Sequence, residues 1–357
     1  MVQHFRSAIG AMCGILQLVS GGASAETTRS SYATIDVPGA VVTFAQNINN
    51  GGEIAGIFES TDNDLHAFVR STDGMIVPVD GPNAVVTFPG DINNKGVMVG
   101  GYSGANQVMH GYLRTADGKL TTIDAPGAGT GGDQGTNPAS LTQKAVIAGY
   151  EIDKNNVNHG IICRNSRHCA VFDAPDAGTG SGQGTVAFSI NDSDEITGYY
   201  IDSGNVQHGF LRTANGDFVE FDAPTAASTE PFRLNNSGAI TGFWFDSATV
   251  EHGFVRSPDG TIASFDDNKA GSGYGQGTQG SAINGSGEIA GFALDSKSIF
   301  HGFVRSRSGA IKTFEAPGAG KTPYYQGTQA SDVNDKGIVV GWYYDDNGYA
   351  HGFVRTP

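Results

Sequence analysis

Histidine is the residue type in this chain whose spacing most suggests chemistry. Each copy is followed by Gly or Ala, two apolar residues and, in all copies but one, Arg. Imidazole can bind zinc or transfer protons near neutral pH, but a catalytic group is needed only once. Repetition indicates a bond that every repeat makes for itself, so we predict structural roles for the arginines and for the histidines, each bonded to a threonine of its own repeat. The seven copies are His66, His110, His159, His208, His252, His301 and His351.

Aromatic residues next to aspartates form a second candidate site. An aromatic face can bury the apolar side of a sugar ring, and a carboxylate can accept hydrogen bonds from its hydroxyls. The alternative is that each aspartate caps a type I turn through its own side chain. We predict carbohydrate binding at Tyr200, Asp202, Trp244, Asp246, Trp342, Tyr343 and Asp345.

One variable position gives a third candidate site. Four residues after a repeated threonine, the repeats carry Asn47, Asp91, Ser140, Ser189, Arg233, Ala282 and Asp332. If the repeats form a ring, Asp332, Asn47 and Asp91 stand side by side near its centre, with Arg233 across from them as a further binding residue. Such oxygens suit calcium, the only cofactor that the sequence suggests. The alternative is that these side chains point between the repeats.

The fixed part of each repeat runs from the threonine to the histidine. Thr43 and its counterparts stand 23 residues before each histidine, and Gly56 and its counterparts stand ten residues before it. The distance between successive histidines varies from 44 to 50 residues, and all of the variation follows the Asp-Ala-Pro-like segment. That segment must lead into a loop.

Each repeat contains four predicted strands separated by turn residues. The last repeat ends after its third strand, and residues 33–40 match the fourth strand and exit of a complete repeat at residues 121–128. An N-terminal strand that completes the last repeat is expected in a closed ring, because it removes the open strand edges. We therefore predict an all-β fold: a seven-bladed β-propeller with four-stranded blades, whose last blade is closed by the N-terminal strand.

The repeat pattern resembles a known family. His-Gly-Phe-Val-Arg, together with Ile-Asn-x-x-Gly-Glu-Ile-x-Gly, is similar to the HAF-type extracellular repeat proteins of bacteria. The third repeat departs from the pattern at Thr142 to Ala145. The resemblance implies an exported repeat protein and supplies no catalytic residues.

The N-terminal segment is typical of an export signal. Residues 1–25 combine a basic start, an apolar stretch and the small residues Ala23-Ser24-Ala25, so we expect one propeller domain over residues 26–357 in a secreted or periplasmic protein. Cleavage would remove Cys13 and leave Cys163 and Cys169, which face each other across one hairpin. We predict a disulfide between them; the alternative is a reactive or metal-binding pair that includes His168.

Charge and missing motifs exclude several function classes. The formal net charge of −15 opposes nucleic-acid binding, no later apolar run is long enough to span a membrane, and the sequence lacks standard hydrolase and nucleotide-binding motifs. We predict a monomeric secreted module that binds carbohydrate or a cell-surface polymer at several similar sites. The alternatives are a polysaccharide lyase or hydrolase with one site at the channel mouth, using residues such as Glu230 or Tyr324, and a structural or adhesive protein.

Overall fold

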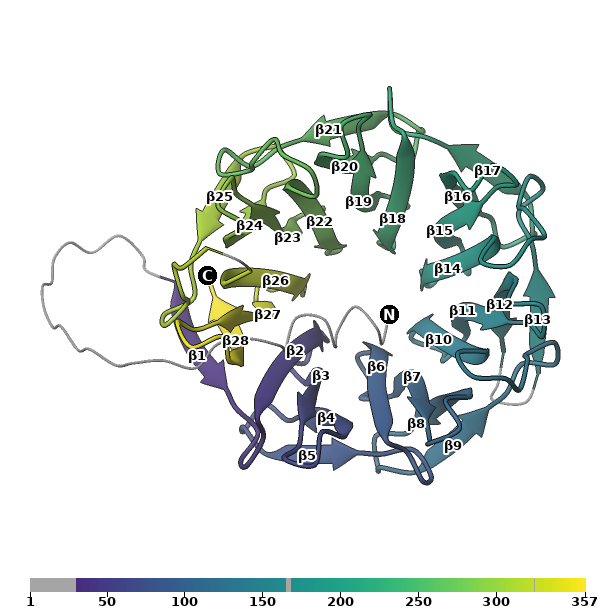
Figure 1. Ribbon diagram of the computed structural model, residues 1–357, viewed down its shortest axis with the longest axis horizontal. Helices are drawn as coiled ribbons and strands as arrows, with labels where there is room; N and C mark the ends of the chain where they lie inside the picture. The colour runs from purple at the N-terminus through teal and green to yellow at the C-terminus, as the bar shows by residue number, and fades with distance from the viewer. Residues whose placement is uncertain (1–29, 165–167, 324) are drawn as a thin grey trace, which may run out of the picture.

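The computed structural model describes residues 30–164, 168–323 and 325–357. The predicted signal peptide and Tyr324 lie outside the described residues. Within these residues, all regular secondary structure is β-strand, which confirms the all-β prediction. Figure 1 shows the strands arranged radially around a central axis, as in a β-propeller.

The strands follow the sequence repeat. Each repeat gives a seven-residue inner strand, a second and a third strand, and a short outer strand. In the first four repeats these are β2 (Val42–Ile48), β3 (Ile54–Glu59), β4 (Leu65–Arg70) and β5 (Ile76–Val79); β6 (Val86–Ile92), β7 (Met98–Ser103), β8 (Met109–Arg114) and β9 (Leu120–Ile123); β10 (Gly135–Leu141), β11 (Ile147–Ile152), β12 (Asn158–Cys163) and β13 (Cys169–Phe172); and β14 (Gly184–Ile190), β15 (Ile196–Ile201), β16 (Gln207–Arg212) and β17 (Phe218–Phe221).

The remaining repeats follow the same order. They contain β18 (Ser228–Leu234), β19 (Ile240–Phe245), β20 (Glu251–Arg256) and β21 (Ile262–Phe265); β22 (Gly277–Ile283), β23 (Ile289–Leu294), β24 (Phe300–Arg305) and β25 (Ile311–Phe314); and β26 (Gly327–Val333), β27 (Val339–Tyr344) and β28 (Ala350–Thr356). Strands within a repeat pair antiparallel in sequence order. The first strand of each repeat lies innermost (Figure 1).

The N-terminal strand β1 (Ser31–Ile35) is the fourth strand of the last group. It pairs antiparallel with β28, with Ser31 opposite Thr356 and Ile35 opposite Gly352. Asp36, just after β1, accepts a hydrogen bond of 2.9 Å at Oδ1 from Nδ1 of His351. The two ends of the chain thus build one four-stranded group, as the match between residues 33–40 and 121–128 indicated.

The Asn-x-x-Gly segments form tight turns after the inner strands. In the first repeat, Oδ1 of Asn49 accepts hydrogen bonds of 2.9 Å from the backbone N–H groups of Gly52 and Glu53. Gly52 has a φ of +97°, a conformation that glycine adopts without a steric penalty. This turn explains why Asn and Gly recur together in the sequence.

Hydrophobic packing and repeated arginines join neighbouring repeats. Phe68, Phe210 and their counterparts are completely buried between strands. The guanidinium of Arg212 lies 4.7 Å from the ring centre of Phe172 in the preceding repeat, and Arg256 and Phe221 repeat this contact at 4.9 Å. A cation over an aromatic face is favourable, so these arginines have the structural role that we predicted.

The histidines are also structural, but their predicted partner was wrong. In His208, for example, Nδ1 lies 2.8 Å from Oδ2 of Asp222, which directly follows the neighbouring outer strand β17. The threonine instead accepts a hydrogen bond from the backbone N–H that follows the acidic residue, as Thr229 does from Ala223 at 3.1 Å. A carboxylate suits imidazole better than a hydroxyl, because it also stabilises the protonated ring.

The predicted disulfide is present. Cys163 and Cys169 are register partners on β12 and β13, their Cα atoms are 4.0 Å apart and their sulfur atoms are bonded. The pairing of the two strands therefore brings the two thiols together, as the hairpin spacing predicted.

Candidate functional site

A cavity of about 510 Å³ opens at the central axis and extends between the second and third repeats. We call it the channel pocket. Each inner strand contains a β-bulge three residues after the repeated threonine, and bulges redirect side chains. In six repeats the extra residue of this bulge lines the pocket: Gly90, Ala139, Phe188, Phe232, Ser281 and Ser331.

The small bulge residues create the space. Gly90 and Ala139 occupy the position where the next two repeats carry Phe188 and Phe232. The cavity therefore opens over the second and third repeats and is bounded by aromatic rings on the fourth and fifth. Of the seven residues one position later, from which we predicted a site, Arg233 lines the pocket and the other six do not.

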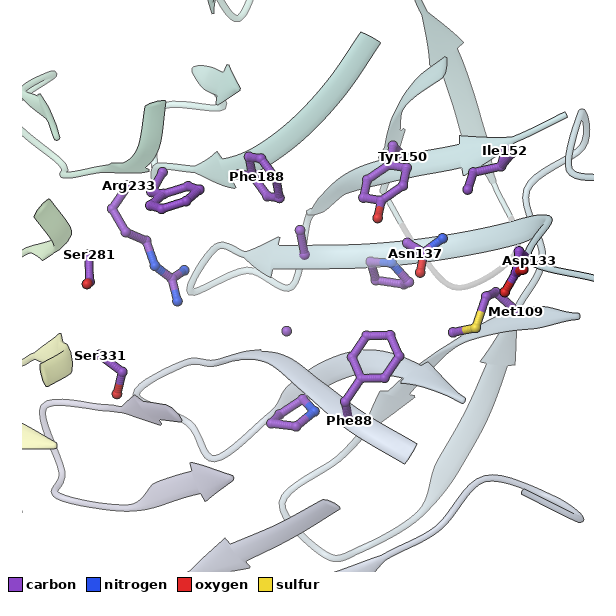
Figure 2. A pocket seen from close by; sticks show the side chains of 15 residues that line it. Phe88, Met109, Asp133, Asn137, Tyr150, Ile152, Phe188, Arg233, Ser281 and Ser331 are labelled. Atoms are coloured by element: carbon purple, nitrogen blue, oxygen red, sulfur yellow. The ribbon is translucent and has the colours of Figure 1, made fainter. Parts of the chain in front are cut away.

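The outer wall of the pocket combines rings with polar groups. Figure 2 shows Asn137 between Phe88 and Tyr150, with Arg233 reaching toward the cavity from the opposite side. Asn137 on β10 and Tyr150 on β11 are register partners, which sets them side by side. Met109, Asp133 and Ile152 complete this wall at the rim.

The polar groups of Asn137 and Tyr150 have unused hydrogen-bonding capacity. Asn137 is 8% exposed, and its side-chain amide makes no hydrogen bond within residues 30–164, 168–323 and 325–357. Burial raises the pKa of Tyr150 to about 12, so its hydroxyl stays protonated at neutral pH. Buried polar groups are usually hydrogen-bonded, so these two groups suit a polar ligand.

The aromatic wall continues beyond the pocket. Phe188 packs against Phe232 with the ring centres 5.6 Å apart, and Phe232 packs against Phe243 at 5.3 Å. Phe188 also contacts Tyr199 at 5.5 Å. These contacts fix the orientation of the rings that face the cavity, because each ring is held by its neighbour.

Arg233 is the basic residue of the pocket, as its position predicted. Its Nη1 lies 3.5 Å from Oδ2 of Asp91 across the channel, and that same oxygen accepts a hydrogen bond of 2.8 Å from Ser140. Burial lowers the pKa of Arg233, but the charges of Asp91 and Asp332 together outweigh it, so the net shift of the pKa is upward. The guanidinium is thus oriented by the acidic side of the channel.

The predicted calcium ligands have other partners. Burial raises the pKa of Asp332 to about 6, and its Oδ2 accepts a hydrogen bond of 2.9 Å from the backbone of Ile48. Asn47, which precedes Ile48 on β2, is buried. In the described part of the chain, no group of three His, Cys, Asp or Glu side chains is arranged to hold a metal ion. Asp91 and Asp332 face Arg233 instead, and the calcium site at Asp332, Asn47 and Asp91 stays a prediction.

Three rings of the predicted carbohydrate-binding residues are buried, and carbohydrate binding at Tyr200, Trp244 and Tyr343 stays a prediction. Tyr200, Trp244 and Tyr343 are only 4%, 8% and 7% exposed, so none offers an open face to a sugar. Trp244 stacks on His252 with the ring centres 4.4 Å apart and donates a hydrogen bond from Nε1 to Ser264 at 2.9 Å. We chose these rings because each stands next to a turn aspartate, but the histidine of the neighbouring strand stacks on each of them.

The other predicted binding residues are the half-buried Trp342 and aspartates that cap turns. Trp342 is half-buried and packs edge-on against Phe44 at 5.6 Å. Asp202 caps its turn by accepting hydrogen bonds of 2.8 Å from the backbone N–H groups of Gly204 and Val206. This is the alternative role that the sequence left open, and it is shared by Asp202, Asp246 and Asp345.

A pair of carboxylates lies on the fifth repeat. Burial and the neighbouring Glu251 raise the pKa of Glu230 to about 7, and burial raises the pKa of Glu251 to about 7. Gln279 of the sixth repeat donates a hydrogen bond of 2.8 Å from Nε2 to Glu251. Both acids are therefore partly protonated at neutral pH.

The comparisons with known proteins concern the fold. No protein family and no curated protein sequence matches this chain, so membership of the HAF-type family stays a prediction. The solved BP39L lectin from Burkholderia pseudomallei is similar at 8% identity and a TM-score of 0.53, over 89% of this chain and 99% of the lectin. A prolyl endopeptidase is similar at 12% identity and a TM-score of 0.52, over 89% of this chain and 51% of that chain.

A further similar structure is the six-bladed β-propeller lectin of Aleuria aurantia, at 8% identity and a TM-score of 0.40, over 90% of this chain and 93% of that chain. At these identities, a lectin and a peptidase share the arrangement of strands with this chain, and similarity of this kind says nothing about ligands. In the described residues we find no helix long and apolar enough to cross a membrane.

Proposed function

We propose that this chain binds carbohydrate and that the channel pocket is its main site. The observation that carries the proposal is the unpaired amide of Asn137 beside the hydroxyl of Tyr150 and the ring of Phe88. A sugar needs both kinds of surface, because its hydroxyls require hydrogen bonds and its C–H face packs on an aromatic ring. Arg233 supplies further donors at the inner end.

We also infer a seven-bladed ring closed by β1. The sequence contains seven repeats, β1 supplies the fourth strand of the last group, and β2 contacts β26, β27 and β28 across the junction. Closure explains why the repeat is divided between the two ends of the chain. A closed ring also holds the bulge residues of successive repeats around one cavity.

The disulfide and the N-terminal sequence support export of the protein. A disulfide persists in an oxidising compartment, and Cys163 and Cys169 form one. Together with the N-terminal signal pattern, this favours a secreted or periplasmic carbohydrate-binding protein.

The channel pocket can be tested by giving one repeat the residue that other repeats carry at the same position. Ala139→Phe places a phenylalanine at the bulge where the next two repeats already carry one, so the strand geometry accepts it while the ring fills the pocket. Gln46→Phe is the matched control, because Gln46 occupies the same bulge in the one repeat that contributes no bulge residue to the pocket.

Protein comprising residues 26–357 is applied to a glycan array. We expect Ala139→Phe to reduce retention by roughly tenfold or more at an unchanged melting temperature, and Gln46→Phe to retain wild-type binding. Full binding by Ala139→Phe would exclude the channel pocket. Product analysis of each retained glycan tests the enzyme alternative, because the Glu230 and Glu251 pair offers a proton donor and an acceptor. New reducing or unsaturated ends would show catalysis.

A further inference from the structure

The repeat places a second set of residues in the same arrangement as the wall of the channel pocket. Counting from the repeated threonine, histidine and glycine gives each pocket residue a counterpart at the junction of the sixth and seventh repeats. Asp133 corresponds to Tyr325, Met109 to Phe300, Asn137 to Gln329, Tyr150 to Trp342 and Ile152 to Tyr344. The second set is more aromatic than the first.

One member of this set is held in a strained conformation. Tyr325 has a φ of +68°, and its backbone N–H donates a hydrogen bond of 2.6 Å to the carbonyl oxygen of Ser298. The corresponding loops use Asp133, Gly182 or Gly275 in the same left-handed conformation. Those residue types tolerate it, whereas a bulky aromatic residue there is unusual and costs stability.

The strained residue exposes its ring. Tyr325 is 57% exposed, and its ring centre lies 5.9 Å from that of Phe300, which in turn packs on Phe292 at 5.4 Å. The loop thus accepts an unfavourable backbone conformation and leaves a large apolar surface in water. Neither feature stabilises the fold, so the tyrosine requires a different explanation.

A buried polar group in the same set of residues points to a ligand independently. Gln329, the counterpart of Asn137, is 8% exposed, and in the described part of the chain its side chain makes no hydrogen bond. Its register partner is Trp342, as Tyr150 is the partner of Asn137. An amide without a partner beside an aromatic ring is the combination that characterises the channel pocket.

We propose that Tyr325, Phe300, Gln329 and Trp342 form a second carbohydrate-binding site, which makes the protein at least bivalent. The inference rests on the proposed function. Nucleobases also stack on exposed tyrosines, but the net charge of −15 opposes a polyanion. A sugar uses both the exposed ring and the unpaired amide. Two weak sites on one protein bind a glycan-coated surface more tightly than either site alone.

The test separates binding from folding. Tyr325→Gly installs the residue that two corresponding loops already use, so it removes the ring and relieves the backbone. We expect a melting temperature equal to or above that of the wild type, together with a roughly twofold to tenfold loss of retention on the glycan array. The control Tyr349→Ala removes another ring, 51% exposed and outside the left-handed region, and should leave retention unchanged.

The outcomes distinguish the two proposals. A lower melting temperature for Tyr325→Gly would show that the ring stabilises the loop, and unchanged retention would show that it contacts no glycan; either result overturns the second site. Loss of binding in Ala139→Phe alone supports only the channel pocket, and loss in Tyr325→Gly alone supports only the second site. If the wild-type protein retains no glycan, both assignments fail.

Discussion

The side-chain amide of Asn334 donates a hydrogen bond of 3.1 Å to the carbonyl oxygen of Asn49, which lies 285 residues earlier in the chain. The same donation links other neighbouring repeats, always from the asparagine that follows an inner strand. The donor and acceptor pairs are Asn49 and Asn93, Asn93 and Thr142, Asn191 and Asn235, Asn235 and Asn284, and Asn284 and Asn334. Thr142 has no amide, and there the backbone N–H of Gln143 donates to Asp192 at 2.8 Å. These bonds run around the axis and favour a closed ring.

Removing one of these links should weaken the whole domain. Asn334→Ala removes the bond to Asn49 and the two bonds that Oδ1 of Asn334 accepts from Lys336 and Ile338. We expect a loss of about 2–4 kcal/mol in the free energy of unfolding, because these groups are buried. Urea denaturation measures it. Asn347→Ala, on an exposed turn, is the control, and equal effects of the two changes would contradict a ring held by these bonds.

The repeat made much of the fold predictable. Fixed spacing from Thr43 to Gly56 to His66 locates three strands, and the divided last repeat predicted that β1 would pair with β28. Cys163 and Cys169 were predictable because both replace repeat residues in one hairpin. Each of these inferences depends only on which residues are neighbours along or across strands.

The binding site was less predictable, because it depends on which face a neighbouring side chain covers. The alternation of Trp244 with Phe243 gives two faces, but nothing local shows that His252 stacks on the tryptophan. The channel pocket depends on a bulge that adds one residue to each inner strand. In the second repeat, the residue that lines the pocket is therefore Gly90, one position before Asp91, where we predicted a site. Comparing residue sizes at every repeat position would have found it.

Trp244→Ala should therefore act on stability and not on binding. Trp244 is 8% exposed, stacks on His252 and donates to Ser264, so its removal leaves a cavity and an unpaired hydroxyl. We expect a loss of about 3–5 kcal/mol with unchanged glycan retention by the protein that remains folded. Trp342→Ala provides the contrast, since it should cost less stability and reduce retention. Equal binding losses in both variants would instead support the predicted carbohydrate binding at Trp244.

The Glu230 and Glu251 pair should make stability fall as the pH rises. Burial raises the pKa of both carboxyls from 4.5 to about 7, so the folded protein holds protons that the unfolded chain has already released. Their stabilising contribution is complete below about pH 4.5 and is lost as the pH rises through 7. The hydrogen bond from His301 to Glu315 raises the pKa of that histidine, and a raised histidine pKa acts in the same direction.

Replacing both acids should flatten this dependence. We expect Glu230→Gln combined with Glu251→Gln to match the wild type near pH 4.5 and to lose less stability between pH 5 and pH 8, by on the order of 1–3 kcal/mol after allowance for solvent screening. Urea denaturation at several pH values measures the two curves. Parallel curves would mean that neither carboxyl titrates in this range.

The disulfide provides the last prediction, since it tests the fold and the compartment in one measurement. Protein isolated after export and alkylated without reduction should begin at Glu26 and contain a linked peptide with Cys163 and Cys169, two hydrogens lighter than the free thiols. The bond closes a short loop, so reduction should cost only about 1–2 kcal/mol of unfolding free energy. Two alkylated cysteines in the exported protein would contradict the bond between β12 and β13. They would instead favour the reactive or metal-binding pair, because free thiolates bind zinc.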